Sequence, residues 1–316
     1  MNSLSAVSAK AKTVTTRGPG PGKRGRGWRT DRLGWLLVTP AAVIIGALVL
    51  YPSATSLIGS LRRYSLMNPE RPFVGLGNYL RVLADPTFRR SMVTTGVYFV
   101  VISVGVLILG IGFALWLQTL RGRARALALG AVIIPWAVPG TVSGLLWSFI
   151  FTPTGAGLLN SALSSLHLID ASHVWLNTPG LGLVLIALTV VWSGTPLGVM
   201  IFLAALEGIP RDLYEQSRID GAGPVRQFWS VSLPLLRPAI AIVLLNGATL
   251  AIGLFDQVYV LVGIDPSKIT IAGSMYLYAF RDFDFGLGFA AAVIAAVITT
   301  LIAVVYLKAV YREVEY

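Results

Sequence analysis

Six long apolar segments constrain the fold of this chain more than any other feature of its sequence. Each meets or exceeds the roughly 20 residues that a helix needs to cross about 30 Å of hydrocarbon, and none contains lysine or arginine. A soluble domain of 316 residues that is 55% hydrophobic and 12% charged could not hide this much apolar surface in one core. The sequence therefore predicts an all-α integral membrane protein with six transmembrane helices. The predicted spans are Leu33–Leu61, Ser91–Gln118, Ala126–Phe151, Leu181–Leu206, Ala239–Val262 and Gly286–Leu307.

The positive charge of the chain follows a topological pattern. With the N-terminus in the cytoplasm, 17 of the 25 lysines and arginines fall on the cytoplasmic side and eight fall outside. This agrees with the positive-inside rule, so the net charge of +11 indicates topology and not nucleic-acid binding. One loop conflicts with the rule, because residues 62–90 carry six arginines and are predicted outside. We expect residues 1–32 to be a disordered basic cytoplasmic tail, 33–312 a transmembrane domain, and 313–316 a cytoplasmic C-terminal end.

Several kinds of chemistry are missing from the sequence. There is no cysteine, and the two histidines, His167 and His173, are too few for a histidine-rich metal centre. The stretch from Gly18 to Lys23 lacks the spacing of a phosphate-binding loop, since Arg24 follows the lysine where serine or threonine is needed. The spans contain neither paired carboxylates nor a nucleophile–base set. We therefore expect no enzyme activity, no metal site and no ATP bound by this chain itself.

The loop between the fourth and fifth spans, residues 207–238, is predicted to be cytoplasmic and folded. Its composition favours a short helix over 212–220, a bend at Gly221 to Pro224, and a second short helix over 225–231. Apolar and aromatic side chains stand among its charges, which is typical of a surface that docks another protein. The alternative, a loop packed against its own helix ends, is equally compatible with the pattern. The apolar side chains are Leu213, Tyr214, Phe228 and Trp229.

This loop resembles the EAA loop of permease subunits in ATP-binding-cassette importers. The family pattern is E-A-A-x-x-D-G-A, followed by an aromatic residue, a hydrophobic residue and L-P. Gln216 and Ser217 depart from it, since alanines are usual at those two positions. The matching residues are Glu215, Asp220, Gly221, Ala222, Phe228, Val231, Leu233 and Pro234.

Other segments resemble the carbohydrate branch of that superfamily, which includes the maltose- and glycerol-phosphate-type permeases. They are Phe73-Val-Gly-Leu-Gly-Asn-Tyr79, the prolines Pro135 and Pro139, and the stretch from Phe255 to Leu261. The turn usual after that last stretch is replaced by Val262 to Pro266. The resemblance covers about residues 33–312 and implies the type I ABC importer permease fold in a bacterial inner membrane.

The resemblance also implies partners and roles. The loop would be a coupling helix that sits on a cytoplasmic ATPase subunit and transmits its closure to the membrane helices. Glu215 would pair with the ATPase or brace the loop, and Gly221 would supply a bend in which a Cβ would clash. The implied assembly holds two ATPase subunits, which bind the ATP and magnesium, a second permease and an extracellular substrate-binding protein.

Polar residues in the fifth predicted span, Ala239–Val262, are candidates for the substrate pathway. The spacing of Asn246, Thr249, Gly253 and Asp256 places them on one face of a continuous helix. Asp256 is the only acidic residue in any predicted span, and such a carboxylate indicates function by default. Gln257 follows it. Three aromatic residues could stack on a sugar or simply pack, and these are Trp147, Trp192 and Tyr259.

Two other classes of protein fit the sequence less well than an ATP-driven carbohydrate importer does. An ion-coupled secondary transporter usually shows several intramembrane ionisable groups and internal repeats, of which this sequence offers one carboxylate and no convincing repeat. A membrane enzyme would need a catalytic constellation that is absent from the spans. The absence of cations from the spans favours a neutral sugar, whose identity the sequence does not specify.

Overall fold

The computed structural model describes residues 27–67, 70–154, 156–169 and 173–311, and it divides the chain into two units between Ala54 and Thr55. The described part of the first unit is a single helical rod, in which the described side chains are nearly all exposed. The helix begins at Gly27, six residues before the predicted start of the transmembrane domain, and the rest of the predicted tail lies outside the described residues. The predicted C-terminal end, 313–316, also lies outside them. The rod contains α1 (Gly27–Ile45), the π-helical turn η1 (Gly46–Leu50) and the start of α2 (Tyr51–Ser60).

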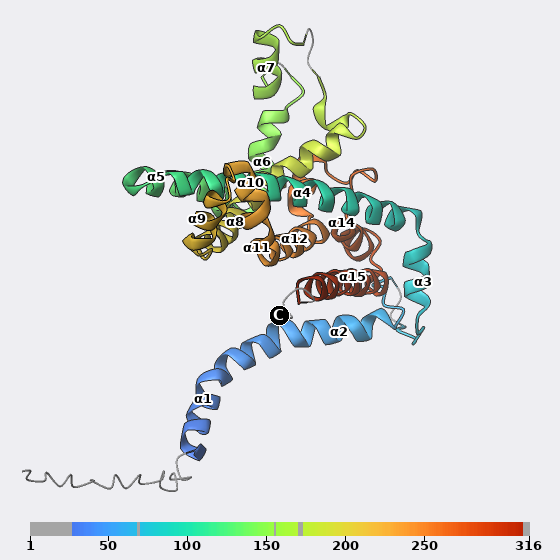
Figure 1. Ribbon diagram of the computed structural model, residues 1–316. Coiled ribbons are helices and arrows are strands. Elements are labelled where there is room, and N and C mark those ends of the chain that lie inside the picture. The colour runs from blue at the N-terminus through green and yellow to red at the C-terminus, as the bar shows by residue number, and fades with distance from the viewer. Residues whose placement is uncertain (1–26, 68–69, 155, 170–172, 312–316) are drawn as a thin grey trace, which may run out of the picture. The chain divides into compact units, whose positions relative to one another are not determined.

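The described residues of the second unit form helices and loops, with two isolated β-bridges and no strand (Figure 1). The first half contains α3 (Gly77–Ala84), α4 (Pro86–Thr119), α5 (Gly122–Ile133), the 3-10 helix η2 (Ile134–Ala137), α6 (Gly140–Phe151), α7 (Leu158–Ser165), η3 (Trp175–Asn177) and α8 (Leu181–Glu207). The second half contains α9 (Arg211–Ile219), α10 (Pro224–Gln227), the π-helical turn η4 (Phe228–Ser232), α11 (Leu233–Leu235), α12 (Arg237–Ile252), α13 (Asp256–Val262), α14 (Ile271–Tyr276), η5 (Leu277–Arg281) and α15 (Phe285–Tyr311).

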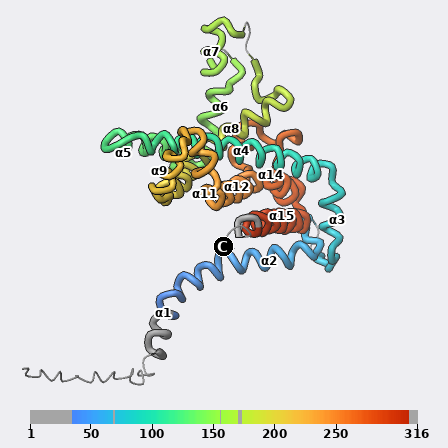
Figure 2. The backbone as a smooth tube through the Cα atoms, in the orientation of Figure 1, coloured from blue at the N-terminus to red at the C-terminus, as the bar shows by residue number. Residues whose placement is uncertain are grey.

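Four helical segments in the described residues are long and apolar enough to cross a membrane, and two bent helix pairs raise the number to six. The four are Trp35–Ser60, Pro86–Thr119, Leu181–Glu207 and Phe285–Lys308. The predicted span Ala126–Phe151 is not one helix, because α5 and η2 are followed at Pro139 by α6 at an angle of 99°. Figure 2 shows α6 and α7 turning away from the bundle formed by α4, α8 and α12. The all-α membrane fold was predicted correctly, whereas the sharpness of this bend was not.

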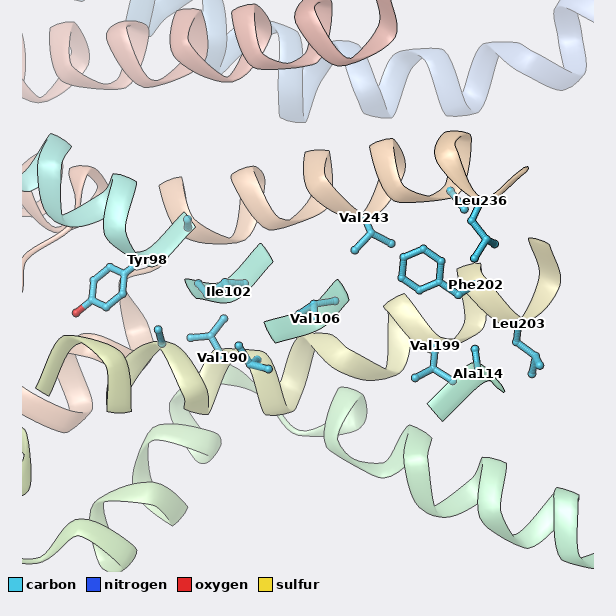
Figure 3. Packing of buried hydrophobic residues seen from close by; sticks show 14 of the residues in the cluster. Tyr98, Ile102, Val106, Ala114, Val190, Val199, Phe202, Leu203, Leu236 and Val243 are labelled. Carbon is cyan, nitrogen blue, oxygen red and sulfur yellow. The ribbon is translucent and has the colours of Figure 1, made fainter. Parts of the chain in front are cut away.

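The core of the second unit is built where α4, α8 and α12 pack together. Figure 3 shows Tyr98, Ile102 and Val106 of α4 meeting side chains of α8, with α12 closing the cluster. Glycine makes the close approach of α4 and α8 possible, since a Cβ on Gly198 would lie 2.8 Å from Val106 Cγ1. Small residues at helix crossings serve this purpose in membranes. Helix α8 continues as one α-helix through the buried Pro196.

Side-chain hydrogen bonds hold the arginine-rich loop before α4 against its neighbours in the second unit. Asn78 of α3 is buried and donates hydrogen bonds of 2.8 Å to the backbone carbonyls of Ser60 and Arg62. Asp85 caps α4 by accepting from the Thr87 amide at 2.8 Å, and it also accepts a hydrogen bond from the Tyr278 hydroxyl of η5. Side-chain hydrogen bonds therefore tie α3 and the start of α4 to their neighbours.

The glycine contact between α4 and α8 gives a matched pair of substitutions on one helix. A Cβ at Gly110 would lie 3.1 Å from the buried ring of Phe202 and 3.3 Å from the backbone of Gly198, whereas a Cβ at Gly112 has nothing within 4 Å. We expect Gly110→Val to lower the free energy of unfolding by about 1–3 kcal/mol, because the added methyl groups overpack the crossing. Gly112→Val should leave it within about 0.5 kcal/mol of wild type. Denaturant unfolding in detergent measures both, and equal stability of the two variants would contradict the close packing.

Candidate functional site

A cavity of about 300 Å³ lies where α12 ends inside the bundle. Its walls come from α8, from α12 with the residues that follow it, and from the bend between η2 and α6. Four of the polar or small residues predicted for the pathway line this cavity together, namely Asn246, Gly253, Asp256 and Gln257. The volume lies at the lower end of the range of small-molecule sites, about 300–1,000 Å³.

The predicted single helical face of the fifth span is wrong, although its residues do meet. Helix α12 ends at Ile252, residues 253–255 are not helical, and α13 starts again at Asp256. Asn246 and Asp256 therefore reach the cavity from two helices, and the break brings them together. Thr249 does not line the cavity, since it is exposed and its hydroxyl donates to the Leu245 carbonyl of its own helix at 3.1 Å.

Gln257 is the buried polar centre that holds the broken span in place. Its side chain is 5% exposed, and its amide nitrogen donates to the Ser143 hydroxyl at 2.7 Å and to the Thr189 hydroxyl at 3.1 Å. These contacts join α13 to α6 and to α8. The two helices α6 and α13 also pack closely, because a Cβ on Gly144 would lie 2.9 Å from Val260. The Gln257 amide nitrogen therefore acts as a structural link and leaves the polar surface of the cavity mainly to its neighbours.

The aromatic candidates separate into two groups. Trp147 and Trp192 contact each other edge to face at 6.0 Å between ring centroids, and Trp147 stacks on Phe151 at 5.5 Å. Neither tryptophan lines the polar cavity; Trp192 borders a second, apolar cavity of about 370 Å³. Tyr259 also lies outside the polar cavity, but its ring is 43% exposed and contacts Phe255 at 5.3 Å.

Three polar or aromatic residues of the cavity lining were missed by the sequence reasoning. Ser193 of α8, Trp136 of η2 and Phe255 of the helix break all line the polar cavity. Ser193 had a usable signal, since it is a polar residue in the middle of an apolar span. Trp136 and Phe255 had no such signal, because an aromatic residue in an apolar segment is usually packed against its neighbours.

The loop 207–238 forms the predicted helix, bend and helix. Helix α9 ends in a Schellman motif, in which the Gly221 amide donates to the Arg218 carbonyl at 3.0 Å and the Ala222 amide donates to the Ser217 carbonyl at 2.9 Å. Gly221 has a φ of +75°, which favours glycine, but a Cβ there would have nothing within 4 Å. The expected steric clash is therefore absent within this chain, and the backbone conformation is what requires glycine.

Contacts within the loop brace its two arms. The hydroxyls of Tyr214 in α9 and Ser232 in η4 lie 2.9 Å apart, and the Gln227 side chain donates to the Ala222 carbonyl at 3.0 Å. Tyr214 and Phe228 are thus partly buried instead of exposed, and Ala222 is buried. Leu233 and Pro234 form part of α11, directly before the 68° bend that leads into α12. The loop is a braced hairpin attached to α8 at one end and α12 at the other.

The outer surface of the hairpin is apolar around the bend. Ile219 is 86% exposed, Val225 72% and Trp229 63%. Leu213 is exposed as well, and so are Glu215 and Asp220 of the same hairpin. Ile219 and Val225 were not among the predicted residues; they lie on either side of the bend, and both are exposed. The exposed apolar residues of the hairpin, Leu213, Ile219, Val225 and Trp229, are together called the hairpin tip below.

Comparison with known proteins assigns the family. Residues 83–315 match the family described as binding-protein-dependent transport system inner membrane component. The chain belongs to this family. The trehalose/maltose transport system permease protein MalF of Thermococcus litoralis is 37% identical over 284 residues, which cover 89% of this chain and 94% of that protein. The trehalose transport system permease protein SugA of Mycobacterium tuberculosis is 34% identical, with 88% of each chain covered.

Solved structures agree on the fold of the permease. A bacterial ABC transporter involved in the import of the acidic polysaccharide alginate matches with a TM-score of 0.75 and 19% identity, covering 91% of this chain and 99% of that chain. The resemblance read from the sequence is therefore confirmed at the level of family and fold. Nothing in the comparisons supports the ion-coupled alternative. The permease is an inner membrane component of a transport system that depends on a binding protein.

The Gln257 link can be tested by a double-mutant cycle. Gln257→Leu removes both hydrogen bonds and leaves the Ser143 hydroxyl buried without its partner, which costs about 1–3 kcal/mol of stability. Ser143→Ala in the Gln257→Leu background should recover part of this loss, because it removes the unpaired hydroxyl. We expect a coupling energy of about 0.5–1.5 kcal/mol between the two positions in denaturant unfolding of the purified permease. Strictly additive effects would mean that the two side chains do not hold α13 against α6.

Proposed function

We propose that this chain is one of two permease subunits of an ATP-driven carbohydrate importer. The observation that carries the proposal is a connection: the braced hairpin 207–238 joins α8 to α12, and these same two helices supply two walls of the polar cavity. A rigid-body movement of the hairpin is therefore passed to both walls at once. In this assembly, two cytoplasmic ATPase subunits bind the ATP and magnesium, and the hairpin tip docks on one of them.

The carbohydrate assignment rests on the relatives and on the chemistry of the cavity. The related proteins named above transport trehalose or maltose, while another, the sulfoquinovosyl glycerol transport system permease protein SmoG of Agrobacterium fabrum, is 31% identical. The cavity lining contains an asparagine, a glutamine, a serine and one carboxylate, but no lysine or arginine. Such a lining can bond to hydroxyl groups and repels an anion, so a neutral saccharide is the expected substrate.

The proposed topology places both termini and the hairpin in the cytoplasm. Arg125 at the start of α5 forms an ion pair with Glu207 at the end of α8, so the basic loop 119–125 and the hairpin lie at the same end of the bundle. Both segments are rich in arginine, as the positive-inside rule requires of cytoplasmic loops. An external binding protein then delivers the saccharide at the opposite end, where α3 lies.

The substrate class is tested with the complete complex. It is purified with its ATPase subunits, the second permease and the binding protein, and ATP hydrolysis in nanodiscs is measured with a panel of ligands. We expect trehalose or maltose to stimulate hydrolysis several-fold over the basal rate and glycerol 3-phosphate to have no effect, because the cavity lacks a cation. Stimulation by glycerol 3-phosphate alone would contradict the neutral-sugar assignment.

Substitutions at the bend test the coupling role of the hairpin. Gly221→Val forces a β-branched residue into a φ of +75°, which costs at least about 1–2 kcal/mol and should distort the Schellman turn. We expect loss of sugar-stimulated ATP hydrolysis and of uptake, with normal amounts of permease in the membrane. Gly221→Asn is the control, since asparagine tolerates this conformation and should retain most of the coupling. Wild-type uptake by the valine variant would exclude the bend from coupling.

The hairpin tip gives a second, independent test of the same role. Ile219→Asp places a charge at the most exposed residue of the hairpin tip, and Ile219→Val keeps that position apolar. We expect the aspartate variant to lose the ATPase subunits during affinity purification of the complex, because a desolvated carboxylate opposes docking. The valine variant should retain them. Full retention by both variants would show that the tip does not contact the ATPase.

A further inference from the structure

A continuous series of aromatic rings leads away from the polar cavity along the second unit. Phe255, which lines the cavity, stacks on Tyr276 at 4.7 Å between ring centroids, and Tyr276 contacts Phe280 at 5.2 Å. The series continues through Phe285 at 6.3 Å and then to Tyr64 at 5.6 Å. Tyr259 and Phe289 flank it. The aromatic ribbon is defined here as Tyr64, Phe255, Tyr259, Tyr276, Phe280, Phe285 and Phe289.

The rings of the ribbon are accessible, unlike those of a core cluster. Phe280 is 62% exposed and Tyr259 is 43% exposed, while the other five rings are partly buried. By comparison, the core rings Phe88, Tyr98 and Phe202 are fully buried. The ribbon is assembled from the break after α12, from α13, α14 and η5, from α15, and from the loop after α2. Helices α14 and α15 pack against each other and bring these segments together (Figure 1).

The tyrosine hydroxyls of the ribbon differ from four tyrosine hydroxyls that bond to other parts of the protein. Each of four other tyrosines has a protein partner for its hydroxyl: Tyr79 with Ser60, Tyr98 with the Lys268 carbonyl, Tyr214 with Ser232, and Tyr278 with Asp85. Within the described residues, the hydroxyls of Tyr64, Tyr259 and Tyr276 make no hydrogen bond to the protein. A tyrosine that presents an accessible ring and a free hydroxyl can bind an amphipathic molecule.

The two ends of the ribbon are polar. At the inner end Asp256 follows Phe255 and lies in the polar cavity. At the other end the Arg71 guanidinium lies 3.9 Å from the ring centroid of Tyr64. In the middle of the series Arg281, which forms an ion pair with Asp282, follows Phe280 directly. A carboxylate and guanidinium groups are costly in hydrocarbon, so these positions indicate a path in contact with water between the outer loop and the cavity.

We propose that the aromatic ribbon is a carbohydrate-binding track that guides a saccharide from the outer face of the permease to the polar cavity. The apolar C–H faces of a pyranose ring stack on the aromatic rings, while its hydroxyl groups bond to the free tyrosine hydroxyls. Successive rings 4.7–6.3 Å apart let the sugar pass from one to the next without being released into bulk water. This inference rests on the proposed function and extends it to residues outside the cavity.

The test uses the complete complex in proteoliposomes, with trehalose and maltose as probes for uptake. Phe280→Leu and Tyr276→Leu keep an apolar side chain but remove the stacking ring, and Tyr276→Phe removes only the hydroxyl. Phe280→Trp restores a ring at the most exposed position. The matched control is Phe113→Leu, because Phe113 of α4 is also an exposed aromatic with an aromatic neighbour, Trp116 at 6.2 Å, but lies outside the ribbon.

We expect the two ribbon leucine variants to raise the KM for uptake about tenfold while leaving the basal ATP hydrolysis of the complex unchanged, since stacking contacts are lost and the hairpin is not touched. Tyr276→Phe should raise the KM less, and Phe280→Trp and Phe113→Leu should behave as wild type. If wild type transports either sugar but the ribbon variants keep its KM, the track is refuted and the proposed function stands. If the wild-type complex transports no saccharide of any kind, the proposed function itself fails, and the track with it.

Discussion

A helix that stops inside a membrane must find partners for its backbone within the protein, because hydrocarbon offers none. Among the residues that the structure describes, interruptions of this kind at 134–139 and 253–255 both border the polar cavity. The Leu254 carbonyl accepts a hydrogen bond from the Thr270 hydroxyl, and the Ser143 amide donates to the Pro139 carbonyl at 2.9 Å. The irregular backbone is thus satisfied by protein on one side and faces the cavity on the other. The position of the cavity is a consequence of this requirement.

The same requirement explains why the cavity and the hairpin are connected. Helix α12 is short because it starts at a 68° bend after Leu235 and ends at the break before Leu254. The chain therefore bends or breaks at both ends of this helix. Between them the helix is held against α4 by buried contacts such as Val243 and Ala251. A short rigid segment between two bends transmits displacement from one end to the other, which is the property that the proposed coupling needs.

Features that neighbouring residues determine could be predicted from the sequence, whereas features that depend on contacts between distant helices could not. The uninterrupted apolar spans, the hairpin and its glycine bend are specified by neighbouring residues, and the sequence predicted them. The break after Ile252 was missed because Asp256 and Gln257 are flanked by apolar stretches on both sides, and the hydropathy of the whole span does not show where the helix stops. Pro135 and Pro139 did signal an interruption, but the 99° angle depends on the packing of α6 against α13. The role of Gln257 required contacts with two distant helices.

These contacts determine which polar side chains of the cavity are available to bind a substrate. The Gln257 amide nitrogen donates to the hydroxyls of Ser143 and Thr189, and the Thr249 hydroxyl donates to a carbonyl of its own helix. Few polar groups therefore remain to bind a ligand. Asn246, Asp256 and Ser193 are the polar side chains that reach the cavity without holding two helices together. A transport pathway benefits from such sparse contacts, because a ligand that is bound tightly at one point is not released at the next. Flat rings and single hydrogen bonds satisfy that condition for a neutral saccharide, whereas a cluster of charges would trap it.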